Sequence, residues 1–536
     1  MHTWFRKVLP LLLAAGLATP ACGGGGDDRD AAVKADCEVA GIENRGQPPV
    51  IESVMITQNP DCVLSAILDV RTDVPASFSL RIEGDGHGRT IRFEERGTDL
   101  ALPILGLRAE TAYSFTVTAA AEDGTSATHG PVSYVTAALP DGPFPPLEVT
   151  IRNEAKMVPG VTVFSSMILQ LPLDQRPGLF LAVDAEGEVI WYHTHPDQVL
   201  ESFRLTEAGT LLYLAGTDGA REMDMLGKTL REWSPQGREM PAGIEVLGVH
   251  HDIIELPGGN VAAIGIEMRD IEHVVEGKAV IHHVMGDVIL EWTRDGALVH
   301  AWSAFDFLDP QFYKQDFFDN FWDLYVDVKG GTKNWTHGNA LIHDATDDSF
   351  ILSLRHLDWL VKVSRQTGKL AWKMGEFGDF ALADGSEWFY HAHSAELLEP
   401  GRIMLFDNGN LRPGYTAETF FSRALELTFD ETSMVCAEAW EWRDSEPFYS
   451  QYLGDADRLP GGNVLVGDGG RVQDQAQPLY NPFNLKWYRI VEVTGDGEVV
   501  WELRARDFSG NVLGYSLYRA QRWPSIYPAA VAQEVP

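Results

Sequence analysis

The sequence predicts an all-β protein in which a six-bladed β-propeller is preceded by a β-sandwich. Three observations lead to this fold class. Short apolar strands alternate with turns rich in Gly, Asp and Asn, and no strong helical periodicity separates them. A turn followed by an apolar strand that ends in Trp recurs six times in the second part of the chain. A second repeat, a tight hairpin turn between apolar strands, interleaves with the first.

The first repeat places a turn with Asp or Gly before its strand, as in QTGKLAW and GDGEVVW. Its six copies end at Trp191, Trp233, Trp302, Trp372, Trp442 and Trp501. The second repeat is clearest in LPGGNVAAIG and LPGGNVLVG, with weaker forms starting at Leu205 and Leu397. Four-stranded units repeated six times are typical of a β-propeller, and we expect residues 150–525 to form it as the catalytic domain. A large sandwich or an irregular all-β fold is the alternative.

Residues 1–22 have the pattern of a lipoprotein-type signal peptide. Two cationic residues precede an apolar run at 8–17, and small residues then lead to Cys22. The apolar run is too short to span a membrane, so membrane attachment is expected only through a lipid on Cys22. We expect an exported protein, periplasmic or anchored to the outer membrane; secretion without lipidation is the alternative. Residues 23–46, polar and Gly-rich, are predicted to be a flexible spacer.

The predicted sandwich covers residues 47–139, where alternating strands such as FSLRIEG are separated by turns. The segment LRAETAYSFTVTA, which contains Tyr113, resembles the strand of fibronectin type III domains that carries a tyrosine corner. We therefore expect a sandwich of this type. Residues 140–149 contain PDGPFPP and are predicted to be a stiff linker to the propeller.

Composition limits the partners of the protein. Lys and Arg number 42 against 78 Asp and Glu, and the net charge of −36 repels nucleic acid and anionic membrane surfaces. The cationic groups that hold an anionic substrate must therefore be local and few. Of the four Cys, Cys37 and Cys62 are candidates for a disulfide in an exported protein. The oligomeric state is not fixed by these patterns, and a homodimer is compatible with them.

Three histidines occupy one position of the second repeat. His251, His337 and His393 each lie five residues before the start of a turn. Because alternate side chains of a strand share a face, the three should point the same way from equivalent strands. The fourth copy carries Gly454 at this position, which argues against a pure packing requirement. If these strands are the innermost ones, the three imidazoles converge on the central channel.

A ring of three imidazoles suggests two chemistries. Neutral imidazoles bind Zn, Fe or Cu, so a metal-dependent hydrolase is one interpretation. The other is a His nucleophile, because imidazole attacks electrophilic centres at neutral pH and leaves easily. Arg355, in the run SLRHLDWL, favours the second interpretation, since a guanidinium binds oxyanion oxygens. A non-catalytic propeller that binds an envelope ligand is a third interpretation.

Several short motifs together resemble one family. WTHGN, ILSLRH, TGKLAWKMG, HSA and LFDNG follow one another as in the bacterial arylsulfate sulfotransferases, which are exported six-bladed propellers preceded by a β-sandwich. The resemblance implies transfer of a sulfuryl group from a phenolic sulfate ester to a phenol acceptor, both small molecules. It implies no nucleotide donor, no cofactor and no metal. The transfer would be ping-pong, through a sulfohistidine.

The resemblance also implies roles by motif position. His393 of HSA would be the nucleophile. His337 of HGN and Arg355 of LRH would hold the sulfuryl oxygens, and His251 of HHD would act at the ester oxygen or the sulfate. Whether His251 or His337 donates a proton stays open at this point.

Two features concern the substrate. Tyr390 and Trp388 lie next to the predicted His393 strand and are candidates for stacking on an aryl ring, although aromatic side chains in propeller strands also serve packing alone. The closely spaced Cys pair of the enterobacterial members is missing, which indicates a divergent member of the family.

Overall fold

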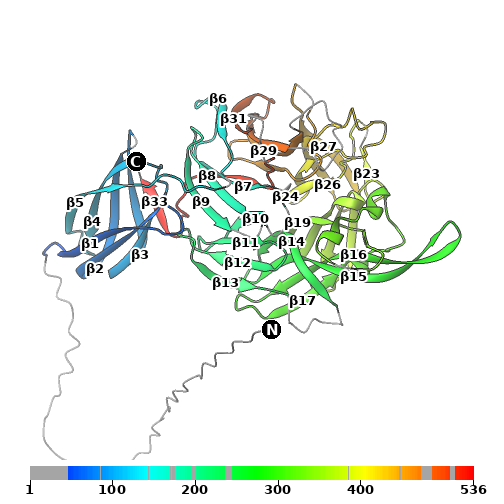
Figure 1. Ribbon diagram of the computed structural model, residues 1–536, viewed down its shortest axis with the longest axis horizontal. Helices are drawn as coiled ribbons and strands as arrows, with labels where there is room; N and C mark the ends of the chain where they lie inside the picture. The colour runs from blue at the N-terminus through cyan, green and yellow to red at the C-terminus, as the bar shows by residue number, and fades with distance from the viewer. Residues whose placement is uncertain are drawn as a thin grey trace, which may run out of the picture. The chain divides into compact units, whose positions relative to one another are not determined.

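The structure is a computed structural model and, as the sequence predicts, it is built almost entirely of β-strands (Figure 1). It describes residues 46–84, 86–142, 144–168, 171, 175–195, 199–235, 244–326, 328–383, 385–445, 448–472, 486–506 and 514–535. The predicted signal peptide with Cys22, and Cys37 in the predicted spacer, lie outside the described residues. Within the described ranges, no helix is long and apolar enough to cross a membrane.

The first sheet has six antiparallel strands in the order β33-β3-β2-β4-β5, with β1 paired to β2. Its strands are β1 (Ile51–Gln58), β2 (Ala66–Gly84), β3 (His87–Ile104), β4 (Ala112–Ala120), β5 (Ser126–Val135) and β33 (Ala532–Val535). The hydroxyl of Tyr113 accepts a hydrogen bond from the backbone N–H of Arg108 at 2.8 Å, the type of contact that a tyrosine corner makes. The resemblance to a fibronectin type III sandwich stays a prediction. The pairing of β33, near the C-terminus, with β3 was not predicted.

Three of the other sheets in the described part of the chain are formed by strands that follow one another in sequence (Figure 1). One contains β10 (Leu200–Leu205), β11 (Leu211–Ala215), β12 (Gly219–Met223) and β13 (Thr229–Trp233). The next contains β14 (Val246–Glu255), β15 (Val261–Val275), β16 (Lys278–Trp292) and β17 (Leu298–Ser303), and β18 (Thr332–Asn334) pairs with β16. The third contains β19 (Gly338–Asp344), β20 (Ser349–Leu354), β21 (Trp359–Ser364) and β22 (Leu370–Gly375).

The remaining three sheets also contain four antiparallel strands each, and two of them have a further strand at one edge. One is formed by β24 (His393–Glu399), β25 (Arg402–Asp407), β26 (Arg423–Asp430) and β27 (Val435–Trp442), with β23 (Ala381–Leu382) paired to β27. Another is formed by β28 (Asp455–Arg458), β29 (Val464–Val472), β30 (Lys486–Val493) and β31 (Val499–Ala505), with β6 (Leu147–Arg152) paired to β31. The last is formed by β32 (Ala520–Trp523), β7 (Val161–Met167), β8 (Gly178–Val183) and β9 (Val189–His195).

The edge strands of these sheets are neighbours in space. In sequence order β10, β14, β19, β24 and β28 each occupy one edge of their sheet, and each is in contact with the next. In the last sheet this edge belongs to β32, so strands from opposite ends of the region share one sheet. Contacts of β29 with β32 and of β7 with β10 close the series.

The Trp repeat of the sequence corresponds to a repeated contact between sheets. Each of three indole N–H groups donates to a backbone carbonyl in a turn of the following sheet: Trp191 to Met225 (2.8 Å), Trp233 to Thr293 (3.0 Å) and Trp501 to Ala185 (3.0 Å). Trp302 lies against the equivalent turn at Gly368, where a Cβ would come within 3.2 Å of its ring and φ is 66°. The Gly turn and the Trp recur together because one packs on the other.

Short helices occur mainly between β17 and β18. They are α1 (Ala304–Phe307), η3 (Gln315–Phe318) and η4 (Phe321–Leu324), with η5 (Arg355–Leu357) between β20 and β21. We call residues 304–334 the insertion segment. Because η3 and η4 bring Asp316 and Trp322 against the histidines described below, this segment forms part of the site.

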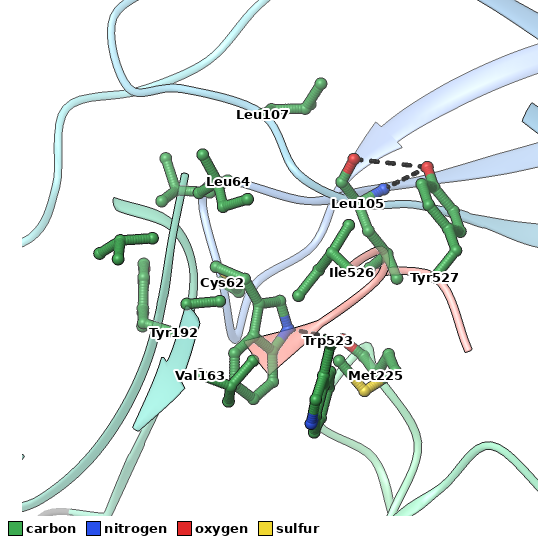
Figure 2. Packing of buried hydrophobic residues seen from close by; sticks show 14 of the residues in the cluster. Cys62, Leu64, Leu105, Leu107, Val163, Tyr192, Met225, Trp523, Ile526 and Tyr527 are labelled. Atoms are coloured by element: carbon green, nitrogen blue, oxygen red, sulfur yellow. Dashed lines mark hydrogen bonds between the residues drawn. The ribbon is translucent and has the colours of Figure 1, made fainter. Parts of the chain in front are cut away.

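The first sheet and the following sheets share a hydrophobic core (Figure 2). Among its buried members are Cys62, Leu64, Leu105, Val163, Tyr192, Met225, Trp523, Ile526 and Tyr527. The hydroxyl of Tyr527 accepts a hydrogen bond from the backbone N–H of Leu105 at 2.7 Å. The thiol of Cys62 is free in this core, and burial raises its pKa to about 11. Because Cys37 lies outside the described residues, a disulfide between the two stays a prediction.

Candidate active site

The structure brings three of the predicted histidines together. His251 belongs to β14, His337 immediately precedes β19, and His393 is the first residue of β24, so the three come from consecutive sheets. The ring centroid of His251 lies 5.1 Å from that of His337 and 6.4 Å from that of His393. All three side chains are buried. The repeat position seen in the sequence therefore corresponds to one place in the fold.

The backbone is unusual at this place. His251 has a φ of 60° and His337 a φ of 52°, in the left-handed region that non-Gly residues seldom adopt. Gly454, at the same repeat position, has a φ of 105°. His393 departs from the pattern, because the positive φ of 50° belongs to Ser394. Register shifts beside all three histidines accompany these conformations, and such bulges re-aim side chains next to functional sites.

His393 is held by a buried amide. Its Nδ1 lies 2.7 Å from Oδ1 of Asn408, and the amide nitrogen of Asn408 donates to the carbonyls of Ser450 (2.7 Å) and Leu453 (2.9 Å). With its N–H groups committed, Asn408 presents oxygen to the imidazole, so Nδ1 carries the proton and Nε2 keeps its lone pair. Burial, and then the charge of Arg355, lowers the pKa of His393 to about 3. The ring is therefore neutral at pH 7.

His337 has a different set of neighbours. Its Nδ1 lies 2.9 Å from the amide nitrogen of Asn334, and its ring stacks on that of His356 with centroids 4.8 Å apart. The ring of Trp322 lies 5.6 Å from it. Burial, and then the neighbouring His356, holds the pKa of His337 well below its usual range.

His251 forms a pair with the adjacent His250. The two Nδ1 atoms lie 2.7 Å apart, and Nε2 of His250 lies 3.0 Å from Oδ1 of Asp287. The backbone N–H of His251 donates to Glu201 at 3.0 Å. Burial, and then His250, holds the pKa of His251 well below its usual range. All three histidines of the site are thus neutral imidazoles in a poorly solvated place.

Arg355 supplies positive charge to this place. It begins η5 and is buried, and its charge contributes to the lowered pKa of all three histidines. Its Nη1 lies 3.8 Å from a carboxylate oxygen of Asp316, which is longer than a hydrogen bond. Asp316 also pairs with His391, whose other ring nitrogen lies 3.0 Å from Asp358. Burial opposes the charge on His391, but these two carboxylates outweigh it and raise its pKa.

The site is suited to anion chemistry. It combines a nucleophilic nitrogen lone pair, neutral imidazoles and a guanidinium in a buried place, where hydrogen bonds and charges act more strongly than in water. Among the described residues, no group of three or more His, Cys, Asp or Glu side chains is arranged to hold a metal ion.

Comparison with known proteins agrees with this chemistry. Residues 149–515, more than half of the chain, match the Arylsulfotransferase (ASST) family. The chain belongs to this family. The match begins within β6 and covers His251, His337, Arg355 and His393.

This chain resembles curated proteins that carry a matching name. It is 26% identical over 402 residues to "Arylsulfate sulfotransferase AssT" of Escherichia coli O6:H1, covering 62% of this chain and 64% of the relative. It is 24% identical over 399 residues to the protein of the same name from Lelliottia amnigena, again covering 62% and 64%. The chain thus spans about 64% of the length of the curated relatives it matches.

Solved structures resemble this chain only distantly. Virginiamycin B lyase from Staphylococcus aureus has a TM-score of 0.29 at 9% identity, covering 67% of this chain and 99% of that one. BamB from Moraxella catarrhalis has a TM-score of 0.25 at 10% identity, covering 75% and 93%. Likenesses at this level add nothing to the sheet topology described above.

The two aromatic residues predicted to bind an aryl ring, Tyr390 and Trp388, contact side chains other than the three histidines. Tyr390 is buried, with the guanidinium of Arg412 5.2 Å and the ammonium of Lys314 5.9 Å from its ring centre. Trp388 is half-buried and packs edge-on against Phe389. The rings of Tyr390 and Trp388 thus contact cations and an aromatic side chain. By contrast, the ring centroid of Phe321, in η4, lies 5.2 Å from that of His337.

Several residues of the site were not predicted. They are His250, His356, Asn334, Asn408, Asp316 and Trp322. A signal existed for two of them, because His250 is adjacent to the predicted His251 in HHD and His356 is adjacent to the predicted Arg355 in LRH. Asn408 lies in LFDNG, one of the motifs that carry the family resemblance. No comparable sequence signal marks Asp316 or Trp322, which belong to the insertion segment.

Proposed function

We propose that this protein is an arylsulfate sulfotransferase that transfers a sulfuryl group from a phenolic sulfate ester to a phenol in two displacements, through a sulfohistidine on His393. The observation that carries the proposal is the state of His393. Its Nδ1 proton is directed to Asn408, so its Nε2 keeps a lone pair beside Arg355. In the structure that lone pair accepts a hydrogen bond from the backbone N–H of Leu453 at 3.3 Å, a contact that the sulfur of the ester replaces. Family membership supports the same reaction class.

In the first displacement, the Nε2 lone pair of His393 attacks the sulfur of the ester. An N–S bond forms, the bond between sulfur and the aryl oxygen breaks, and its electron pair leaves with the phenolate. The imidazole ring becomes positively charged because Nδ1 keeps its proton. The carbonyl oxygen of Asn408, 2.7 Å from Nδ1, stabilises that charge.

The transition state of this step needs hydrogen-bond donors around sulfur. Sulfuryl transfer resembles phosphoryl transfer, in which charge lies on the nonbridging and leaving oxygens. In our proposal Arg355 and His337 bind the nonbridging oxygens. Since burial excludes water from these groups, they are oriented before the reaction begins, which is the condition under which electrostatic stabilisation is most effective.

The second displacement regenerates the enzyme. The oxygen of the acceptor phenol attacks sulfur, the N–S bond breaks and its electron pair returns to Nε2 of His393. The phenol proton is accepted by a neutral imidazole, for which His251 is our candidate because its ring lies 6.4 Å from that of His393. His251 then passes this proton to solvent, which balances the proton that the phenolate released in the first step takes up from solvent.

The aryl group needs an apolar surface next to sulfur. Tyr390 and Trp388 are the residues proposed from the sequence. Phe321 is a further candidate, because it is half-buried and its ring lies 5.2 Å from that of His337.

The finer description of the protein belongs to the same proposal. The six four-stranded sheets with adjoining edge strands are best understood as the blades of a propeller, whose axis the three histidines approach. Export, and lipidation of Cys22, are supported by the sequence of residues 1–22.

The decisive experiment is mass spectrometry of the purified protein after brief exposure to 4-nitrophenyl sulfate without acceptor. We expect one sulfuryl group, located on His393 by peptide mapping, and its loss when phenol is added. Release of 4-nitrophenol should then depend on the acceptor. Sulfuryl transfer by an acceptor-dependent route with no modified protein would contradict the sulfohistidine, and no transfer at all would contradict the reaction class.

Variants provide the matched comparison. His393→Ala should abolish both modification and turnover. His300→Ala is a suitable control, because His300 is an exposed residue of β17 outside the site, and it should retain the activity of the wild-type protein.

A further inference from the structure

We propose that Asn334 and Trp322 are positioning residues that hold the proton of His337 on Nε2, so that this histidine is a hydrogen-bond donor while His393 is a nucleophile. The inference rests on the proposed function for its catalytic meaning. It adds what the sequence left open, namely which nitrogen of each neutral ring carries the proton and which groups decide it.

The orientation of the Asn334 amide follows from Trp322. An indole N–H can only donate, and Nε1 of Trp322 lies 3.0 Å from Oδ1 of Asn334. Oδ1 therefore faces Trp322, and the amide nitrogen faces Nδ1 of His337 at 2.9 Å. The same Nδ1 is 3.3 Å from Oδ1, the longer of the two distances. Nδ1 of His337 is thus an acceptor, and its proton lies on Nε2.

The two histidines form a contrasting pair. Each is hydrogen-bonded through Nδ1 to a buried Asn, but the two amides are turned in opposite ways. The amide nitrogen of Asn408 is committed to two backbone carbonyls, so His393 meets an oxygen. The amide oxygen of Asn334 is committed to an indole, so His337 meets a nitrogen. One ring keeps a lone pair at Nε2 and the other a proton.

Burial makes this arrangement independent of pH near neutrality. Asn334 and Asn408 are fully buried, and Trp322 is 3% exposed, so water does not compete for these hydrogen bonds. The pKa of both histidines is lowered, mainly by burial, so neither ring takes a second proton at pH 7. The amide partners therefore decide the tautomer.

A neutral imidazole with its proton on Nε2 can donate to an anionic oxygen without itself being charged. In the proposed reaction His337 would donate to a sulfuryl oxygen beside the guanidinium of Arg355. Such a donor, fixed in advance in a buried site, commonly contributes about 100-fold or more to the rate. Asn334 and Trp322 would not touch the substrate and would act through His337.

The first test reads the tautomer directly. The protein is labelled with ¹⁵N-histidine, and the ring nitrogens of His337 are identified by comparison with His337→Gln. We expect the Nε2 signal of a protonated nitrogen and the Nδ1 signal of an unprotonated one. The opposite pattern would overturn the inference. Because this measurement uses the unliganded protein, it holds whether or not the protein transfers sulfuryl groups.

The second test reverses the partner. Asn334→Asp is nearly isosteric and still accepts from Trp322, but it offers oxygen to Nδ1 of His337. We expect the ring proton to move to Nδ1 and kcat/KM for 4-nitrophenyl sulfate to fall about 100-fold. An unchanged tautomer, or a changed tautomer with wild-type kcat/KM, would refute the positioning role.

Two indole variants separate positioning from packing. Trp322→Phe keeps the ring but removes the N–H that orients Asn334, and it should give a mixture of tautomers with a smaller loss of kcat/KM. Trp335→Phe is the control, because Nε1 of Trp335 donates to the carbonyl of Phe312 at 2.9 Å rather than to Asn334. It should leave the His337 signals as they are in the wild-type protein. Equal effects of the two variants would contradict the proposal.

Discussion

The pH dependence of the first displacement tests the state of His393 most directly. In a ping-pong reaction, kcat/KM for the sulfate ester depends only on the free enzyme and on the steps up to release of the phenol. A sulfate ester stays anionic throughout the usable range of pH, so the acid limb of this parameter reports the enzyme. Burial and Arg355 lower the pKa of His393 to about 3. Protonation would remove the attacking lone pair.

The size of the effect follows from this value. At pH 5 a histidine of pKa about 3 is about 1% protonated, whereas one of ordinary pKa near 6.5 is about 97% protonated. We therefore expect kcat/KM at pH 5 to remain close to its value at pH 7.5. With a nucleophilic imidazole of ordinary pKa, kcat/KM would fall about 30-fold between pH 7.5 and pH 5.

The assay is release of 4-nitrophenol in samples that are stopped and made alkaline before reading, with phenol in excess. Circular dichroism at each pH shows whether the protein is still folded. An acid limb with its midpoint near pH 6.5 in folded protein would refute the idea that burial controls the nucleophile.

Three other predictions concern stability and specificity. Between pH 6.5 and 3 the unfolded chain binds a proton at residue 393 that the buried His393 of the folded protein does not bind, so the free energy of unfolding falls as the pH falls. Urea unfolding should show that, between pH 7.5 and 5, the free energy of unfolding of His393→Gln falls by about 2 kcal/mol less than that of the wild-type protein. Phe321→Leu should raise KM for aryl sulfates about 3- to 10-fold, because the ring of Phe321 lies beside that of His337. Phe318→Leu is the control and should leave KM unchanged, because Phe318 lies in the same segment but its ring contacts that of Phe317. Equal KM values for the two variants would exclude Phe321 from the aryl site. Trp233→Phe should lower the free energy of unfolding by about 1 kcal/mol through loss of its hydrogen bond to Thr293, and an unchanged urea midpoint would contradict that role.

The repeats allowed the main parts of the site to be predicted. His251, His337 and Gly454 occupy one repeat position, and all three have a positive φ in the structure. A fixed position within a strand repeat becomes a fixed position in space, because equivalent edge strands adjoin. The Trp copies were likewise visible in the sequence, and in three of them the indole donates to a turn of the following sheet.

What the sequence could not reveal depends on contacts between distant segments. Trp322 reaches the histidines only because the insertion segment, which also contains Asn334, lies against them, and no periodicity encodes that path. In a regular strand the neighbouring side chains of His250 and His251 would face opposite ways. The register shift that follows His250 breaks this rule, and the Nδ1 atoms of His250 and His251 meet at 2.7 Å. Local departures from regular strand geometry are what sequence patterns predict least well.

The strands near the C-terminus determine when the site can exist. β32 completes the last sheet, and β33 pairs with the first sheet of the chain. Tyr518, two residues before β32, has ring contacts with His251 at 5.8 Å and with His393 at 6.5 Å. During synthesis the histidines are made long before these partners, so a growing chain holds the reactive ring without the wall that encloses it. The complete site therefore forms only after β32 and β33 have been made and have paired with strands from the beginning of the chain.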